Sequence, residues 1–212
     1  MRLRIAALPQ VLSGGVKLRR ALLFIFPLIA VFTGCYREPV PARETVPEGA
    51  RIYLQDRGLK VAPALDAQIV DYVNLDRNAL TNIDEIATLV NLKWLRLNDN
   101  RLAKLPDLKS LKSLRRIYLR GNQFTEVPET LKDLESLTDI ELSSNPIKEI
   151  PRWLTEKTGL KNLSFNNTAI TRLPDDLSAW ENLQSLQLGD LRLSAEEMAR
   201  IRKALPCVAI VF

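Results

Sequence analysis

The side chains best suited to binding lie in the middle of the chain and are mainly aromatic or cationic. Aromatic residues and arginine are the types most enriched among the side chains that dominate binding at protein interfaces. The candidate partner-binding residues are Tyr72, Trp94, Arg96, Arg116, Tyr118, Arg120 and, beside them, the acidic Glu141. These side chains indicate recognition of another macromolecule.

Catalytic and metal-binding chemistry is scarce. The chain has no histidine, which removes the commonest general base and a common metal ligand. No serine-nucleophile, Walker, zinc or calcium-loop spacing occurs. The carboxylate pairs Asp175-Asp176 and Glu196-Glu197 are expected to be solvated charges. We therefore expect no enzyme activity, no metal site and no cofactor.

A sequence repeat positions the candidate residues. The pattern L-x-x-L-x-L-x-x-N-x-L occurs six times within residues 70–193, and successive copies begin 22 or 23 residues apart. Apolar residues fill the four apolar slots of every copy. One such unit cannot bury its apolar face alone, so a fixed period of this size predicts a solenoid of stacked units.

A further apolar residue lies 13 positions after each of the first five repeat starts, and four of these five residues are followed by proline. The whole pattern resembles that of the leucine-rich repeat family. The resemblance covers about residues 70–212. It implies an α/β solenoid with a curved parallel sheet on the concave face and helical or irregular segments on the convex side. Because side chains alternate along a strand, the residues between the leucines of each L-x-L segment would face outward.

The asparagine slot of the repeat has a structural explanation. Asn78, Asn100, Asn122 and Asn145 fall where the chain turns away from the strand and leaves backbone groups unpaired. An amide side chain both donates and accepts hydrogen bonds. A column of buried asparagines is therefore expected to join neighbouring coils.

Both ends of the array need caps, because an uncovered terminal coil would expose the core. Residues 51–69 do not fit the repeat and are predicted to form an N-terminal cap with one strand. Residues 194–212 predict a C-terminal cap, with a helix that begins at Ser194 and a buried final strand over residues 208–212. Cys207 is expected to be a small buried hydrophobe.

The first 35 residues have a different character. An apolar run from Ala21 to Phe32 follows a basic segment and is too short to span a bilayer as an ordinary helix. This arrangement predicts a secretory signal. The ending Phe32-Thr33-Gly34-Cys35 resembles the lipobox of bacterial lipoproteins, which implies cleavage before Cys35 and a diacylglycerol on its sulfur. A plain signal peptide or an uncleaved anchor is the alternative.

In the lipoprotein interpretation, residues 1–34 are the signal peptide and residues 35–50 are the lipidated cysteine and a proline-rich tether. We then expect no intramolecular disulfide. The long basic segment leaves two possible starts, Met1 and Val16. Tyr36 rather than aspartate follows the cysteine, which resembles the outer-membrane default in cells with two membranes.

The charge balance argues against nucleic acid as a partner. Residues 1–35 contain five of the 30 Lys and Arg residues and none of the 25 Asp and Glu residues. The remaining chain therefore carries 25 charges of each sign, and the excess of +5 belongs to the export segment. Nucleic-acid binding therefore has no support from the overall charge of the remaining chain.

These observations predict a monomeric, lipid-anchored protein of the bacterial cell envelope that binds a protein partner through its concave face. Two alternatives remain at this stage: a glycan or cell-wall ligand on the same aromatic and arginine side chains, or a structural envelope protein without a specific ligand. A simpler interpretation of the face is that its arginines only pair with Asp139 and Glu141 across neighbouring strands.

Overall fold

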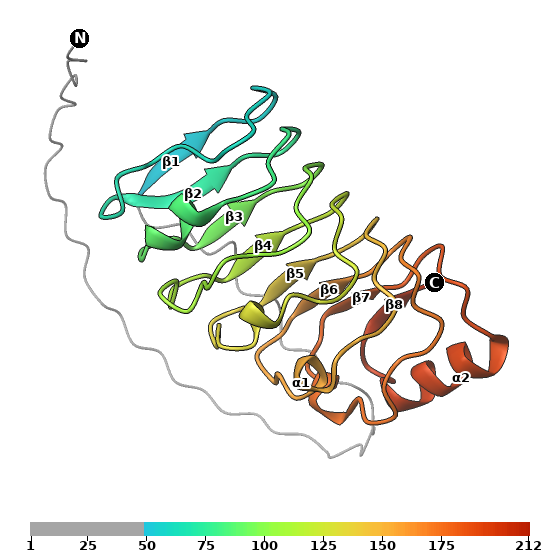
Figure 1. Ribbon diagram of the computed structural model, residues 1–212. Helices are drawn as coiled ribbons and strands as arrows, with labels where there is room; N and C mark the ends of the chain where they lie inside the picture. The colour runs from blue at the N-terminus through green and yellow to red at the C-terminus, as the bar shows by residue number, and fades with distance from the viewer. Residues whose placement is uncertain (1–48) are drawn as a thin grey trace, which may run out of the picture. The chain divides into compact units, whose positions relative to one another are not determined.

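The computed structural model describes residues 49–212, where eight short strands lie side by side (Figure 1). The strands are β1 (Ala50–Tyr53), β2 (Val70–Asn74), β3 (Trp94–Arg96), β4 (Arg116–Tyr118), β5 (Asp139–Glu141), β6 (Asn162–Ser164), β7 (Ser185–Gln187) and β8 (Ala209–Val211). They form one parallel sheet in which each strand pairs with the next in the chain. The predicted curved parallel solenoid is confirmed.

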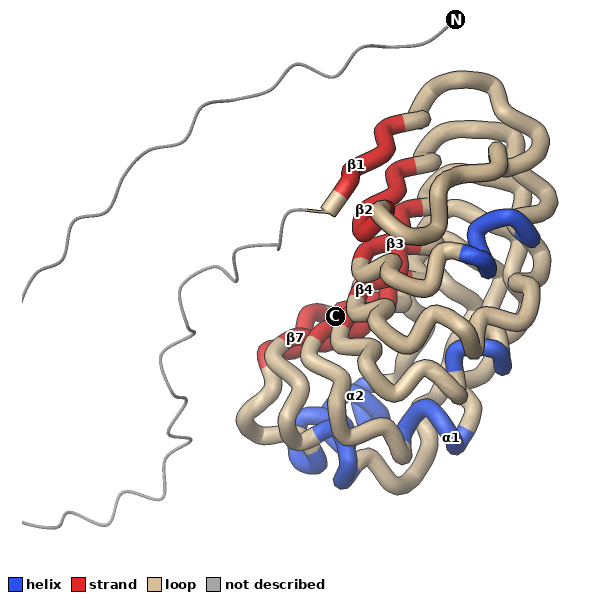
Figure 2. Tube along the Cα trace, turned by 90° about the vertical axis from the view of Figure 1, so that its left-hand side faces the viewer, coloured by secondary structure: helices blue, strands red, loops and turns tan. Residues whose placement is uncertain are grey.

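Short helices occupy the return segments, away from the sheet (Figure 2). They are three 3-10 helices at Asp84–Thr88, Glu129–Leu131 and Ser178–Trp180, and the α-helices α1 (Arg152–Thr155) and α2 (Ala195–Ala204). Pro128 and Pro151 come directly before two of these helices. Proline has no N–H for a strand ladder and its ring fixes φ near the helical value, so it ends extended structure where the coil must turn back.

The core is the stack of apolar side chains from the repeats. All the apolar slots of the six copies are buried except Leu193, which is half-buried at the junction with the C-terminal cap. The apolar residues of the return path, Ile83, Leu105, Val127, Ile150 and Leu173, are buried as well. Burying one such side chain stabilises the fold by about 1.5–3 kcal/mol, so the stacked coils supply a large core.

The asparagine column joins the coils as predicted. Asn100 Nδ2 donates to the carbonyl of Leu75 in the preceding coil at 3.0 Å and to that of Leu97 in its own coil at 3.0 Å. Its Oδ1 accepts the N–H of Leu80 at 3.1 Å. Asn122 and Asn145 repeat this arrangement one and two coils further on.

The residue before each asparagine slot adopts a left-handed backbone conformation. The φ values are +52° at Arg77, +55° at Asp99, +66° at Gly121, +56° at Ser144, +53° at Asn167 and +61° at Asp190. Only one of these residues is glycine, so the repeat holds ordinary L-residues in a conformation that they rarely adopt. These six residues lie where the chain turns away from the sheet after β2 to β7.

The N-terminal end of the sheet is β1, which pairs with β2 across an irregularity in register. Ala50 pairs with Val70, whereas Arg51 pairs with Tyr72, so Asp71 has no opposite residue. A bridge between Val61 and Asn82 ties the following loop to the first repeat.

The C-terminal segment differs from the prediction in three respects. Glu197 is only 9% exposed rather than solvated, because its carboxylate bonds the Leu173 N–H and the Arg200 guanidinium. In β8, Ala209 and Val211 are exposed and only Ile210 faces the core, since the concave side of the last strand is open. Cys207 is exposed, not buried. The only other cysteine, Cys35, lies outside the described residues.

Glu197 ties α2 to the return segment of the fifth repeat. Ser194 Oγ accepts the N–H of Glu197 at 3.2 Å and begins the helix, as predicted. The Glu197 Oε1 then accepts from Leu173 N at 2.8 Å, and Arg200 donates to both carboxylate oxygens. Arg200 also donates to the Leu173 carbonyl, so one ion pair closes the end of the solenoid.

We expect the stability that Glu197 contributes to depend on pH. The hydrogen bond from Arg200 lowers the pKa of the Glu197 carboxyl. The ionised form therefore stabilises the fold above the unfolded-state pKa of about 4.3, and this contribution is lost as pH falls through the lower folded-state pKa. Glu197→Gln should reduce the free energy of unfolding by about 1–2 kcal/mol at pH 7.

Urea unfolding at pH 7, 4 and 3 measures this effect. The gap between wild type and Glu197→Gln should shrink as the pH falls, while the exposed control Glu181→Gln should show no gap at any pH. A gap that is independent of pH would contradict a role for the ionised carboxylate.

Candidate binding surface on the concave sheet face

Strand register gathers the outward side chains of the sheet into two rows. The first row runs Tyr72, Trp94, Arg116, Asp139, Asn162 and Ser185. The second row runs Asn74, Arg96, Tyr118, Glu141, Ser164 and Gln187. Six of the seven predicted binding residues lie in these rows, whereas Arg120 lies just beyond the end of β4 and is exposed.

Three aromatic rings form a ladder across β1, β2 and β3. The rings of Tyr53 and Tyr72 have centroids 5.3 Å apart with planes at 44°, and those of Tyr72 and Trp94 are 5.9 Å apart at 62°. Tyr53 is 52% exposed, so the ladder is open to solvent at its β1 end. We call Tyr53, Tyr72 and Trp94 the aromatic ladder.

Tyr53 is not among the predicted binding residues, because it lies in the N-terminal cap and outside the repeat. The alternation in Arg51-Ile52-Tyr53 was the available signal, since it matches the outward–inward–outward pattern of the repeat strands. Only the pairing of β1 with β2 brings the ring onto the same face as Tyr72.

Two arginines extend the ladder toward β4. The Arg116 guanidinium carbon lies 4.3 Å from the centroid of the Trp94 ring, and that of Arg96 lies 5.3 Å from the Tyr118 ring. Each contact is a cation–π interaction between neighbouring strands. The aromatic and arginine side chains of β2, β3 and β4 therefore form one continuous patch.

The same arginines also form ion pairs, so the pairing interpretation is partly correct. Arg116 Nε lies 3.5 Å from an oxygen of Asp139 on the next strand. Arg96 pairs instead with Asp76 of the preceding repeat, at 2.7 Å. The Arg120 backbone N–H donates to Asn98 Oδ1, while its side chain extends into solvent at the edge of the face.

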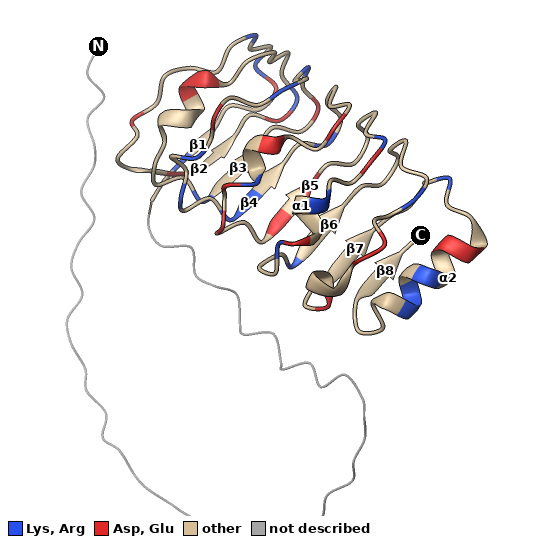
Figure 3. Cartoon of the chain, turned by 60° about the horizontal axis from the view of Figure 1, so that its bottom comes forward, with Lys and Arg blue, Asp and Glu red and all other residues tan. Residues whose placement is uncertain are grey.

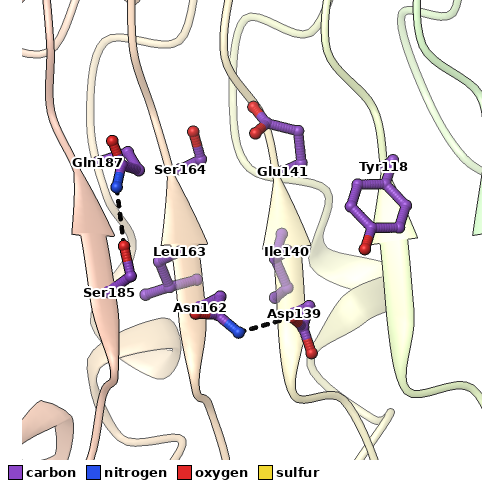
Figure 4. Close-up of a pocket in the computed structure, with 9 residues that line it drawn as sticks. All are labelled: Tyr118, Asp139, Ile140, Glu141, Asn162, Leu163, Ser164, Ser185 and Gln187. Atoms are coloured by element: carbon purple, nitrogen blue, oxygen red, sulfur yellow. Dashed lines mark hydrogen bonds between the residues drawn. The ribbon is translucent and has the colours of Figure 1, made fainter. Parts of the chain in front are cut away.

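A shallow hollow lies on the face beside this patch, between β4 and β7 (Figure 4). Its volume is about 140 Å³. The polar side chains around it are Tyr118, Asp139, Glu141, Asn162, Ser164, Ser185 and Gln187, and Ile140 and Leu163 lie beneath them. Figure 3 shows basic residues on β4 next to acidic residues on β5, so the sign of charge changes at the edge of the hollow.

Most of the polar groups of the hollow bond one another. Asn162 Nδ2 donates to Asp139 Oδ1 at 2.7 Å, and Gln187 Nε2 donates to Ser185 Oγ at 2.8 Å. The Glu141 Oε1 accepts the N–H of Ser143 at 2.7 Å. These bonds hold the side chains in place before any ligand arrives, which limits the conformational entropy lost on binding.

Burial raises the pKa of the Tyr118 hydroxyl and that of the Tyr72 hydroxyl. Both phenols therefore stay protonated throughout the physiological range and keep their O–H as a donor. Neither side chain changes charge near pH 7, so the face has no titratable group of this kind to switch binding on or off.

Asp71 lies at the start of β2 with both carboxylate oxygens buried and without a hydrogen-bond donor. The closest cation is the Lys93 ammonium, 4.0 Å from Oδ2. The backbone of Gly49 packs against the carboxylate so closely that an added Cβ would clash with it. Asp71 and Asp76 lie on either side of the outward residues of β2 in the sequence, yet both are buried.

Two negative observations apply to residues 49–212. No cluster of three or more potential metal ligands occurs in this part of the chain. In the same residues, no helix is long and apolar enough to cross a membrane.

Comparisons with known proteins agree with this architecture. The family model described as "Leucine rich repeat" matches residues 91–147. An internalin (inlF) from Listeria monocytogenes str. 4b F2365 is similar with a TM-score of 0.54 and 24% identity, over 66% of this chain and 41% of the internalin chain. A Shigella effector LRR domain has a TM-score of 0.54 and 25% identity, over 78% of this chain and 81% of that domain.

The chain thus spans less than half the length of the internalin. The comparison with curated proteins finds no match. The family-model match and the two structures agree with the sheet topology, and the fold is a leucine-rich repeat solenoid. Proteins of this class generally mediate protein interactions, because a solenoid offers an extended concave surface.

Replacing Lys93 should destabilise the domain through Asp71. Lys93→Met removes the nearby positive charge but keeps most of the aliphatic stem, so the buried carboxylate loses its compensation. We expect the free energy of unfolding to fall by about 1–3 kcal/mol. Chemical denaturation measures the change, with exposed Lys132→Met as the matched control.

The double variant Asp71→Asn with Lys93→Met should recover most of that loss, because the buried group is then uncharged. Equal stability of Lys93→Met and Lys132→Met would show that the Asp71 charge needs no compensation from Lys93.

Proposed function

We propose that this protein is held at a bacterial cell envelope by a lipid on Cys35 and binds a protein partner through its concave face. The observation that carries the binding proposal is the aromatic ladder, exposed at Tyr53 and half-buried at Tyr72 and Trp94, with its two flanking arginines. Tryptophan, tyrosine and arginine are enriched among the few residues that dominate binding at protein interfaces, and here they lie together on an open sheet.

The geometry favours a protein over a glycan. A sugar ring packs on the flat face of an aromatic ring, but the Arg116 guanidinium lies over Trp94 and that of Arg96 over Tyr118. The ladder rings are also inclined to one another by 44° and 62°, so they form no common platform. An uneven surface with edges, cations and one small hollow suits the side chains of a protein.

A purely structural role explains less of the face. Ion pairs at an exposed surface contribute little to stability, typically below about 1 kcal/mol. They give no reason for three large aromatic side chains to collect on the solvent side of β1, β2 and β3. A binding role accounts for the rings and the arginines together.

The lipid anchor rests on the sequence of residues 1–35, which lie outside the described residues. The basic segment, the apolar run and the Phe32-Thr33-Gly34-Cys35 motif support it. A sulfur that carries a diacylglycerol is not available for a disulfide, so the anchor and a bond between Cys35 and Cys207 exclude each other. The outer membrane is the proposed location in a cell with two membranes.

Truncating the aromatic ladder tests the binding proposal. Trp94→Ala should weaken binding by about 2 kcal/mol or more, because it removes a large central contact. The loss of ring contacts should cost the fold only about 1 kcal/mol. The full-length variant is expressed in cells, partners are captured by crosslinking, and melting is recorded in parallel.

The control is Lys132→Ala on the exposed return path, which should leave both capture and melting unchanged. Capture of the partner that survives Trp94→Ala would place the interface elsewhere. Retention of the wild-type protein on purified cell wall, lost in Trp94→Ala, would favour the glycan alternative.

Labelling with a fatty-acid analogue tests the anchor. Wild-type protein should carry the label and remain in the membrane fraction, since a diacylated cysteine supplies the two chains that stable anchoring requires. Cys35→Ser should accumulate as an unlabelled precursor. Recovery of unlabelled wild-type protein with Cys35 in a disulfide with Cys207 would overturn the anchor.

A further inference from the structure

The concave face divides into two halves of different chemistry. The half formed by β1 to β4 offers aromatic rings and guanidinium groups, whereas the hollow between β4 and β7 offers mainly oxygen atoms. A partner that covers both halves needs an apolar contact for the first and a donor for the second. The need for a hydrogen-bond donor in the hollow is specific enough to identify the type of partner side chain that binds there.

Three oxygen-bearing side chains align in register across the hollow. Glu141, Ser164 and Gln187 occupy equivalent positions on β5, β6 and β7. Adjacent strands lie about 4.8 Å apart, so a short serine between two long side chains leaves a space above it. Figure 4 shows this arrangement, with Ser164 between Glu141 and Gln187.

The oxygens that face this space still have capacity to accept. Glu141 uses Oε1 for the Ser143 N–H, and no described residue donates to its Oε2. Gln187 uses its Nε2 for Ser185, and no described residue donates to its Oε1. The Ser164 hydroxyl shares one hydrogen bond with the Ser143 hydroxyl and retains a lone pair.

The neighbouring carboxylate is already engaged. Asp139 accepts from Asn162 and lies against Arg116, so its charge is compensated within the domain. Glu141 is different, because its only hydrogen bond among the described residues comes from a neutral backbone N–H. The hollow therefore retains one uncompensated negative charge next to two neutral acceptors.

We infer that the hollow receives the side chain of a lysine from the protein partner, with its ammonium held by Glu141, Ser164 and Gln187. This inference rests on the proposed function, because it names the partner chemistry for the same face. An ammonium has three donors on a compact head, one for each of these three acceptors on neighbouring strands. Arginine fits less well, since its planar fork is best satisfied by two free oxygens of one carboxylate.

The size of the hollow supports a single side chain. Its volume of about 140 Å³ lies well below the roughly 300–1,000 Å³ of pockets that hold whole small molecules. Ile140 and Leu163 below and Tyr118 at one side would contact the aliphatic stem of the lysine. Long cationic side chains commonly bury their stems in this way.

One short segment of the partner can supply both the lysine and an apolar side chain that contacts the aromatic ladder. Trp94 lies on β3 and Glu141 on β5, so two strand spacings of about 4.8 Å separate their strands. A few residues of a partner cover that separation. The face is therefore complementary to a segment that presents an apolar side chain and a lysine close together.

A zero-length carbodiimide crosslinker tests this contact directly, because it joins a carboxylate only to an amine that touches it. Cells that express the full-length chain are treated with the reagent, and crosslinked peptides are identified by mass spectrometry. The expected product joins Glu141 to a lysine of a second protein. It should be absent in Glu141→Gln and present in Glu149→Gln, which alters an exposed carboxylate on the return path.

Glu141→Gln keeps an acceptor for the Ser143 N–H and should fold normally, as its melting temperature will show. It should weaken partner capture by about tenfold, the effect of losing a hydrogen bond to a charged group. Full capture by Glu141→Gln, together with lost capture by Trp94→Ala, would overturn the lysine contact and leave the proposed function intact. Full capture of the partner by Glu141→Gln and by Trp94→Ala would overturn the lysine contact and the proposed binding face together. A crosslinked product in which Glu141 is joined to an amine of a non-protein molecule would also overturn both.

Discussion

The hydrogen bonds of a buried asparagine amide in three successive turns hold the coils of this domain in register. Asn100, Asn122 and Asn145 each bond a carbonyl of the preceding coil and a carbonyl of their own coil. The same side chains accept a backbone N–H from the preceding coil. The left-handed residue before each asparagine aims the amide into the coil, and its strained backbone is tolerated because the stack provides these bonds.

The binding face is a consequence of that register. A one-residue slip between coils would turn every outward side chain toward the core, so the stacking that buries the leucines also aligns the two outward rows. The aromatic ladder, the guanidinium contacts and the hollow all lie at matching positions on successive strands. Binding residues that are 22 or 23 positions apart in the chain thereby become neighbours.

At the two ends of the solenoid, polar and charged groups have no neighbouring repeat to bond with. At the C-terminal end, Glu197 and Arg200 satisfy backbone groups of the fifth return segment within a well-hydrogen-bonded ion pair. At the other end, Asp71 is buried at the register irregularity of β1 and β2 without a donor. The first end is closed by a hydrogen-bonded ion pair, whereas at the second only the Lys93 ammonium, 4.0 Å from Oδ2, offsets the Asp71 charge.

The sequence by itself determined the solenoid, the strand positions and the structural role of the asparagines, because these follow from a short period and from side-chain alternation. It also identified six outward residues of the two rows, since each lies between or next to inward slots. Tertiary structure decided their partners: Arg96 bonds Asp76, Arg116 covers Trp94, and Tyr53 joins the ladder from outside the repeat.

The burial of Asp71 and Glu197, the exposure of Cys207 and the hollow beside Ser164 were also beyond the pattern. Each of these features depends on which side chains of a neighbouring coil or cap contact the residue. The repeat pattern is the same for every coil and therefore does not contain this information. Side-chain periodicity predicts which way a residue points, whereas distances between long side chains on adjacent strands decide what it binds.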